Sequence, residues 1–287
     1  MRDVRNRQQW LLAATFFCAA ATGFAEKKSA AQELVELKVR EAASGSAEEW
    51  KAIGAEYAAL VKKHPREATI RGARGEYFWR MNDRESAVRE WLVGVKVEPK
   101  NAAILNHLGE AHLAMGEPRK SLAFFTRSSV VEPQNALTHF SIANIASVFR
   151  HGLGKTEQEC FDLALRHFAE AHRLAPQNAE FARGYAETFY MVPKPDWPTA
   201  LKVWQDCLNL MPEKDFVLLN LARVHMKLGD SASARACLAQ VTGPEAGRQK
   251  NRLEARIEAE LSPQKPPKSS GTENSPKPGI DEAPMPP

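Results

Sequence analysis

The chain has 287 residues, of which 44% are hydrophobic, and its formal net charge at pH 7 is +4. This hydrophobic content is enough to bury a core, and the length allows one or two ordinary domains. Without the three arginines and one aspartate of the first 25 residues, the net charge falls to +2. So balanced a chain gives no electrostatic case for nucleic-acid binding, and we expect no nucleic-acid partner.

Residues 1–25 have the pattern of a secretory signal peptide. A basic start precedes an apolar run and a small residue: Arg2, Arg5 and Arg7, then Trp10 to Ala21, then Ala25. The apolar run is shorter than the roughly 20 residues that a membrane-spanning helix needs. We therefore expect cleavage near Ala25 and an exported protein, periplasmic or extracellular. We expect a membrane partner only if the N-terminus is retained or is lipidated at Cys18.

Residues 26–67 are expected to form a pair of helices. Apolar residues recur with helical spacing from Ala30 to Ala43, and Ser44, Gly45 and Ser46 interrupt them. Ser46 and Glu49 have the spacing of a capping box, so a second helix is expected to begin there. Pro65 marks its end.

The stretch from Ala102 to Asn135 is 34 residues long and divides into two amphipathic halves. The first half carries Leu105, Leu108 and His112 on one face and ends at Gly116. The second half carries Ser121, Phe125 and Ser128 on one face and ends at Pro133. Both the length and the pattern are those of a helix–turn–helix repeat.

This stretch resembles the tetratricopeptide repeat (TPR), whose pattern W-x2-L-G-x2-Y, A-x3-F and P it matches at the L-G, F and P positions. The resemblance implies an all-α fold, a right-handed α-solenoid of stacked helix–turn–helix repeats. After a degenerate first pair at 26–67, it places five TPR units within 68–242. Their ranges are 68–101, 102–135, 136–178, 179–214 and 215–242.

Three features depart from a regular repeat. Arg71 and Arg74 replace the expected Trp and Leu, which leaves the packing of that helix open. Residues 243–261 form a charged C-terminal capping helix that is expected to bury Leu253, Ile257 and Leu261. Residues 262–287 contain eight prolines among polar residues, so we expect a disordered Pro-rich tail.

Two lengthened turns form a second candidate surface, at 152–155 and 193–198. The second turn carries Trp197 as a possible anchor, although insertions without function also collect in surface loops. Gly152 to Thr156 reads GLGKT, like the end of a phosphate-binding loop. Phe149 occupies the position of the required first glycine, and a helix precedes it where a strand is needed. We therefore expect no nucleotide site, and a capping box formed by Thr156 and Glu159.

No motif for catalysis or metal binding occurs. The sequence contains neither H-E-x-x-H nor C-x-x-C, so we expect no metal, no cofactor and no catalytic residue. His112 and His225 occupy the Tyr position of the repeat, where core packing explains them. After cleavage three cysteines remain, so at most one internal disulfide can form; Cys207 and Cys237 are expected to be buried hydrophobes.

The TPR resemblance implies that the first helices of the units line a groove that binds a peptide or a partner helix. A cytosolic chaperone is disfavoured as partner, because Gly72 and Glu76 replace the Lys and Asn of the known carboxylate clamp. Phe140 and Leu219 have an alternative role, packing against the neighbouring unit. The groove residues that the resemblance implies are Glu76, Trp79, Arg80, Asn106, Glu110, Leu113, Phe140, Asn144, Arg183, Glu187, Tyr190, Leu219, Arg223 and Met226.

From these features we expect a non-catalytic scaffold or adaptor with a protein or peptide partner. One alternative is an envelope-anchored assembly factor, of the pilus or outer-membrane assembly type, held by its N-terminus. Another is an enzyme with a site built across the repeats.

Overall fold

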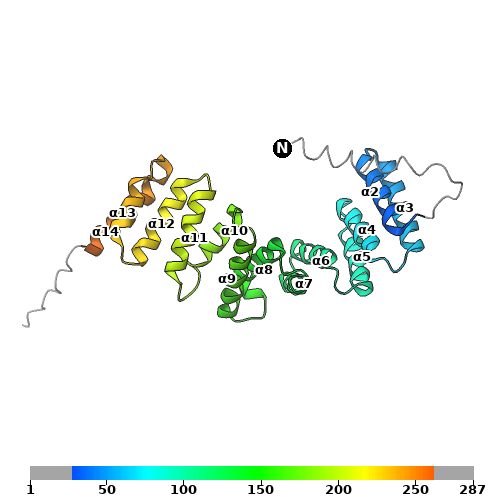
Figure 1. Ribbon diagram of the computed structural model, residues 1–287, viewed down its shortest axis with the longest axis horizontal. Helices are drawn as coiled ribbons and strands as arrows, with labels where there is room; N and C mark the ends of the chain where they lie inside the picture. Colours follow the sequence, from blue (N-terminus) through cyan, green and yellow to red (C-terminus); the bar gives the residue numbers. More distant parts are fainter. Residues whose placement is uncertain (1–27, 262–287) are drawn as a thin grey trace, which may run out of the picture. The chain divides into compact units, whose positions relative to one another are not determined.

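The computed structural model describes residues 28–261, and these are helical throughout apart from short turns (Figure 1). The fold is all-α, as the sequence predicts. The expected signal peptide at 1–25 and the expected tail at 262–287 lie outside the described residues. No helix within 28–261 is long and apolar enough to span a bilayer.

The helices divide into two compact units, one up to Pro195 and the other from Asp196. The boundary falls inside the expected repeat 179–214. The first unit contains α2 (Ala30–Ala43), α3 (Ala47–Lys63), α4 (Ala68–Arg80), α5 (Arg84–Val97), α6 (Ala102–Ala114), α7 (Pro118–Val131), α8 (Ala136–Val148), η1 (Arg150–Gly152), α9 (Glu157–Leu174) and α10 (Ala179–Thr188). The second contains α11 (Trp197–Leu210), α12 (Lys214–Lys227), α13 (Ser231–Ala239), η2 (Pro244–Ala246) and α14 (Gly247–Leu261).

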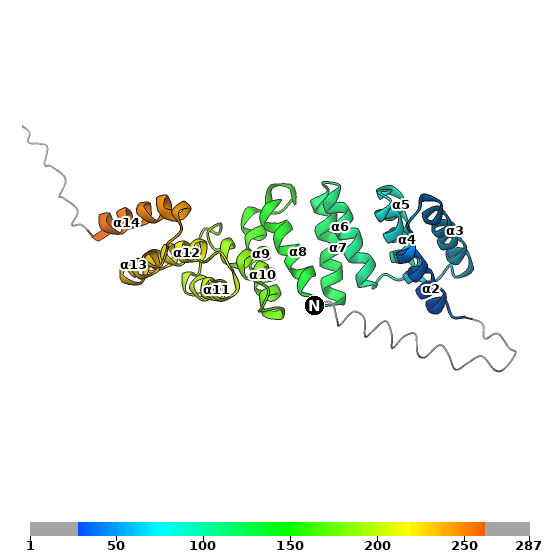
Figure 2. The ribbon, with the colours of Figure 1, turned by 90° about the horizontal axis from the view of Figure 1, so that it is seen from above.

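Within the first unit, consecutive helices pack side by side as pairs, α4 with α5, α6 with α7 and α8 with α9 (Figure 2). Capping residues in the sequence mark where several helices begin. Asn101, Asn135 and Asn178 cap α6, α8 and α10 through their side-chain oxygens. Such caps satisfy backbone N–H groups that the first turn leaves unpaired.

In two of these pairs, α4 with α5 and α6 with α7, a glycine of one helix packs against a large ring of the next. Gly75 of α4 faces Trp91 of α5, and a Cβ atom at Gly75 would lie 2.2 Å from Trp91 Nε1. Gly109 of α6 faces Phe125 of α7 in the same way, at 2.8 Å. Trp91 and Phe125 are both buried. Glycine is therefore required at these positions because the rings fill the space that a side chain would take.

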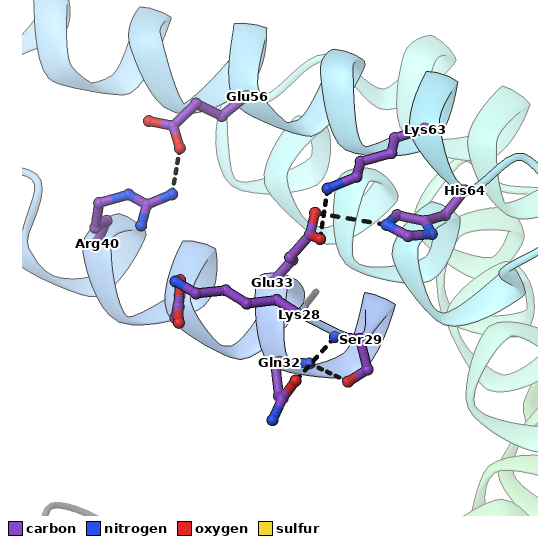
Figure 3. Close-up of polar contacts among 9 residues, drawn as sticks. Lys28, Ser29, Gln32, Glu33, Arg40, Glu56, Lys63 and His64 are labelled. Carbon is purple, nitrogen blue, oxygen red and sulfur yellow. Dashed lines mark hydrogen bonds and ion pairs between the residues drawn. The ribbon is translucent and has the colours of Figure 1, made fainter. Parts of the chain in front are cut away.

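The first helix pair is joined by contacts of Glu33 with Lys63 and His64, and its second helix is capped as the sequence predicts. Lys63 Nζ lies 2.6 Å from Glu33 Oε1 and His64 Nε2 lies 3.5 Å from Glu33 Oε2 (Figure 3). The capping box of Ser46 and Glu49 is present at the start of α3, and that of Thr156 and Glu159 at the start of α9.

Arg71 and Arg74, whose packing the sequence left open, are accommodated by a carboxylate of the paired helix. Arg71 Nη1 lies 3.1 Å from Glu90 Oε2, and Arg74 Nη1 lies 2.8 Å from Glu90 Oε1. The three side chains are mostly buried, with exposed fractions of 17%, 22% and 15%. Glu90 therefore neutralises part of the charge that replaces the usual apolar residues.

The C-terminal helix α14 buries fewer of its apolar side chains than expected. Ile257 is fully buried against Leu218, Leu219 and Leu238, and Leu253 is partly buried there. The prediction that Leu261 is buried is wrong, since 57% of it is exposed. It is the last residue of α14 and lies one turn beyond Ile257.

Candidate functional site

A chain of charged side chains links three helices of the first unit. Glu76 of α4 lies between Lys38 of α2 and His107 of α6. Its Oε2 atom is 3.3 Å from Lys38 Nζ, and its Oε1 atom is 3.3 Å from His107 Nε2. On the other side of the His107 ring, Nδ1 lies 3.9 Å from Glu110 Oε2. Glu76 and Glu110, both expected in the groove, are thus brought together by a histidine that the sequence pattern did not single out.

Glu76, His107 and Glu110 line a pocket of about 220 Å³ between α4, α5 and α6. Trp79 and Trp91 supply its apolar walls, with ring centroids 5.8 Å apart. The Trp91 ring is held by its Nε1–H, which donates to the Gly72 carbonyl oxygen at 3.0 Å. The pocket is lined by Glu76, Trp79, Arg80, Trp91, His107 and Glu110.

The His107 ring is positioned by stacking and by charge. It lies nearly parallel to the Trp91 indole, with centroids 5.1 Å apart and an angle of 15° between planes. Burial lowers the pKa of His107, but Glu110 and Glu76 outweigh it and raise the pKa to about 9. The hydrogen bond from His107 likewise lowers the pKa of Glu76 to about 2. Burial opposes this shift, and the charge of Lys38 adds to it. At neutral pH the pocket therefore holds an imidazolium between two carboxylates.

Arg80 borders the pocket and is held by a buried carboxylate of α2. One of its guanidinium nitrogens, Nη2, donates to Glu41 Oε1, and Glu41 is 4% exposed. The Arg80 side chain itself is 49% exposed. The remaining Arg80 N–H groups form no hydrogen bond within residues 28–261, and neither does the Glu110 carboxylate, which is 59% exposed. Charged groups at the rim are thus left with unused hydrogen-bonding capacity.

The other expected groove residues of the first unit are mostly engaged within the fold. Asn106 accepts a hydrogen bond from Thr138 Oγ1 of α8 at 3.1 Å, and Leu113 packs against the core beneath α6. Arg183 pairs with Glu187 one turn later on α10, at 2.8 Å. Asn144 is half-buried, and Tyr190 is 38% exposed.

Two of the expected groove residues, Phe140 and Leu219, are mostly buried, in agreement with the alternative that they pack within the fold. Phe140 is 8% exposed and packs against Phe168 and Phe181, with ring centroids 5.7 and 4.6 Å away. Leu219 in the second unit is 3% exposed. Phe140 is therefore covered by neighbouring rings and does not line the expected groove, whereas Leu219, though mostly buried, contributes to the wall of a pocket in the second unit. Helix α8 instead exposes Leu137 and Val148, which are 58% and 64% accessible.

In the second unit, α14 engages the expected groove residues of α12. Arg223 Nη2 donates to Gln249 Oε1 of α14 at 2.9 Å, and Met226 packs against the core that contains Ile257. A pocket of about 540 Å³ lies beside them, with Phe216, Leu219 and Pro244 among its walls. Trp197, the possible anchor on the long turn, is half-buried and lies 6.0 Å from Lys227 Nζ.

The remaining polar groups serve the fold. His112 is buried, with Nδ1 2.6 Å from Glu117 Oε2, as core packing at that position implies. The other lengthened turn inserts Leu153, which is 5% exposed, into the core. In the described part of the chain no three His, Cys, Asp or Glu side chains are grouped to hold a metal, and no disulfide joins Cys160, Cys207 and Cys237. Cys207 is buried and Cys237 partly buried.

The sequence pattern missed four residues of the site: Lys38, Glu41, Trp91 and His107. A signal existed for one of them, since His107 precedes Glu110 by three residues and such pairs meet on a helix surface. The other three come from α2 and α5, and only tertiary packing brings them to α4 and α6.

No protein-family model and no curated protein matches this chain. Solved structures are similar to this chain, and the similarity to YrrB shows the fold. YrrB, described as a TPR protein with an unusual peptide-binding site, has 11% identity and a TM-score of 0.55, over 71% of this chain and 97% of that one. MamA from Desulfovibrio magneticus RS-1 has 15% identity and a TM-score of 0.47, over 66% and 96%. PilW, a type IV pilus biogenesis factor, has 14% identity and a TM-score of 0.48, over 81% and 100%.

Proposed function

Since this chain has the tetratricopeptide-repeat fold, we propose that it is a non-catalytic scaffold that holds a segment of a protein partner on the α2, α4 and α6 face of its first unit. One observation carries the proposal. The pocket between α4, α5 and α6 combines aromatic walls with rim groups, Arg80 and Glu110, whose hydrogen-bonding capacity the described residues leave unused. Aromatic and arginine side chains at a partly desolvated pocket are the usual anchors of protein interfaces.

The size of the pocket supports a protein partner over a free small molecule. Its volume of about 220 Å³ lies below the roughly 300–1,000 Å³ of most small-molecule sites. It is large enough for the end of one side chain. A segment that inserts such a side chain can also contact the flanking faces of α2 and α6, which supply the additional area that a stable interface needs.

The test is selection of a random peptide library, displayed on phage, on the full chain without its first 25 residues. We expect an enriched sequence family that no longer binds after Trp79→Ala with Glu110→Ala. A matched control, Val130→Ala on α7, changes a residue that is 79% exposed and does not line the pocket. Each variant must show the melting curve of the parent. Enriched peptides that bind the double variant as well as the parent would overturn the site.

Export is also a proposal, and it rests on the pattern of residues 1–25. The mass of the N-terminal peptide of the protein, recovered from the producing cell, tests it. A chain that begins at Glu26 supports an exported scaffold without an N-terminal anchor. A retained or lipidated N-terminus instead supports the alternative, an assembly factor held at the envelope membrane.

A further inference from the structure

The open groups of the pocket are a donor and an acceptor placed side by side. His107 Nε2–H is directed to Glu76 at 3.3 Å, which leaves Nδ1–H facing Glu110. The distance from Nδ1 to Glu110 Oε2 is 3.9 Å, too long for a hydrogen bond. A ligand group at this position can thus accept from His107 and donate to Glu110 at the same time.

The charges around this position are balanced, which argues against a charged ligand group. Arg80, Lys38 and the His107 imidazolium provide three positive charges, and Glu41, Glu76 and Glu110 provide three negative charges. A ligand carboxylate would meet both glutamates at short range, and a ligand ammonium would meet Arg80 and His107. Either would leave like charges close together in a partly desolvated site.

A carboxamide satisfies both groups without adding charge. The side chains of glutamine and asparagine carry an acceptor oxygen and a donor NH2 on one carbon, and they bind paired acceptor and donor groups in a bidentate manner. The aromatic walls, Trp79 and Trp91, can enclose the apolar stem of such a side chain. Because the pocket is small and lies between helices, it admits the end of a side chain, while the main chain of the ligand passes outside.

Building on the scaffold function, we propose that this pocket takes the carboxamide of a glutamine or asparagine in the partner segment. Glu110 accepts from the amide NH2 and His107 Nδ1–H donates to the amide oxygen. Arg80 borders the same space and can donate to the ligand oxygen from its unused N–H groups. The pocket therefore determines which residue of the partner anchors the segment.

The experiment measures binding of the peptide enriched in the selection above, by calorimetry, with its anchoring position varied. We expect a Gln or Asn consensus there, and at least about tenfold weaker binding for each of Glu, Lys and Met, because each leaves a pocket group unpaired or opposed. Binding of any of the three within about twofold of Gln overturns the carboxamide. That result leaves the scaffold function intact, whereas the scaffold function fails if no peptide depends on Trp79 and Glu110.

A charge change in the pocket provides a second, independent readout. Glu110→Lys replaces the acceptor with a cation, so the same peptide with Glu at the anchoring position should now bind more tightly than the one with Gln. The matched control is Glu85→Lys on α5, where the side chain is 89% exposed and pairs with Arg89 at 3.6 Å. Glu85→Lys should keep the preference for Gln. An unchanged preference in Glu110→Lys would contradict the proposed contact.

Discussion

Tyr57 of α3 donates its phenolic hydroxyl to Glu41 Oε2 of α2 at 2.9 Å, and both residues are buried. Burial, then the hydrogen bond and charge of Glu41, raise the pKa of Tyr57. The other Glu41 oxygen accepts from Arg80 of α4. One carboxylate thus joins three helices and fixes an arginine at the rim of the pocket, so the site depends on a residue that no ligand can reach.

Glu41→Ala should lower the free energy of unfolding by about 2–4 kcal/mol, because it leaves the Tyr57 hydroxyl and one side of Arg80 without a partner. Urea denaturation measures this loss. Glu36→Ala, on the same helix but in an exposed pair with Lys28, should change it by less than about 0.5 kcal/mol. Equal effects of the two substitutions would show that Glu41 is not structural.

Gly75→Ala should destabilise the first unit by about 1–3 kcal/mol, since the new methyl group would lie 2.2 Å from Trp91 Nε1. The displaced indole also loses its hydrogen bond to the Gly72 carbonyl and its stacking with His107. The free energy of unfolding, measured by urea denaturation, and the affinity for the ligand should therefore fall together. The control is Gly45→Ala, where no atom lies within 4 Å of the added carbon. A neutral Gly75→Ala would contradict the packing.

The stability of the fold should fall as the pH is lowered from about 6.5 toward 4, because of a histidine pair between α8 and α9. His139 Nε2 lies 3.1 Å from the Pro133 carbonyl oxygen, so His139 Nδ1 is left to accept from His167 Nδ1–H at 2.8 Å. Burial, then His139 and Arg166, lower the pKa of His167 to about 4, against an opposing effect of Glu170. The unfolded chain therefore takes up a proton near pH 6.5, before the folded chain does.

Thermal melting at a series of pH values tests this dependence. His167→Gln keeps a donor but cannot be protonated, so its Tm should vary less between pH 6.5 and 4 than that of the parent. His151→Gln, at an exposed position of η1, should leave the dependence unchanged. If His167→Gln and the parent lose stability in parallel, the pair is not the acid-sensitive element.

The opposite pH dependence is expected of His107. Its pKa is raised in the folded state from 6.5 to about 9, so its stabilising contribution is complete below pH 6.5 and is lost as the pH rises through 9. His107→Gln should abolish this alkaline loss, as measured by urea denaturation between pH 6 and 10. An alkaline loss of equal size in His107→Gln would assign it to another group.

The local elements could be predicted from the sequence because their signals are short-range. Helical spacing of apolar residues predicted α2 from Ala30 to Ala43, and two capping boxes predicted the starts of α3 and α9. The L-G, F and P positions of the repeat at 102–135 predicted a helix–turn–helix pair, which α6 and α7 form. Repeats reinforce such signals, because the same contacts recur between neighbouring units.

The site depended on tertiary structure. A motif position specifies which way a helix residue points, but not whether a neighbour covers it, and so Phe140 was assigned to a surface that it does not reach. Trp91 joins the pocket from α5, and Lys38 and Glu41 of α2 hold the charged groups that line it. No local pattern connects these three residues to Glu76 and Glu110. The sequence alone determined a stack of helix pairs, because backbone caps and apolar spacing are local. Packing decided where charged side chains meet, because their pairing depends on distances between helices that the sequence does not specify.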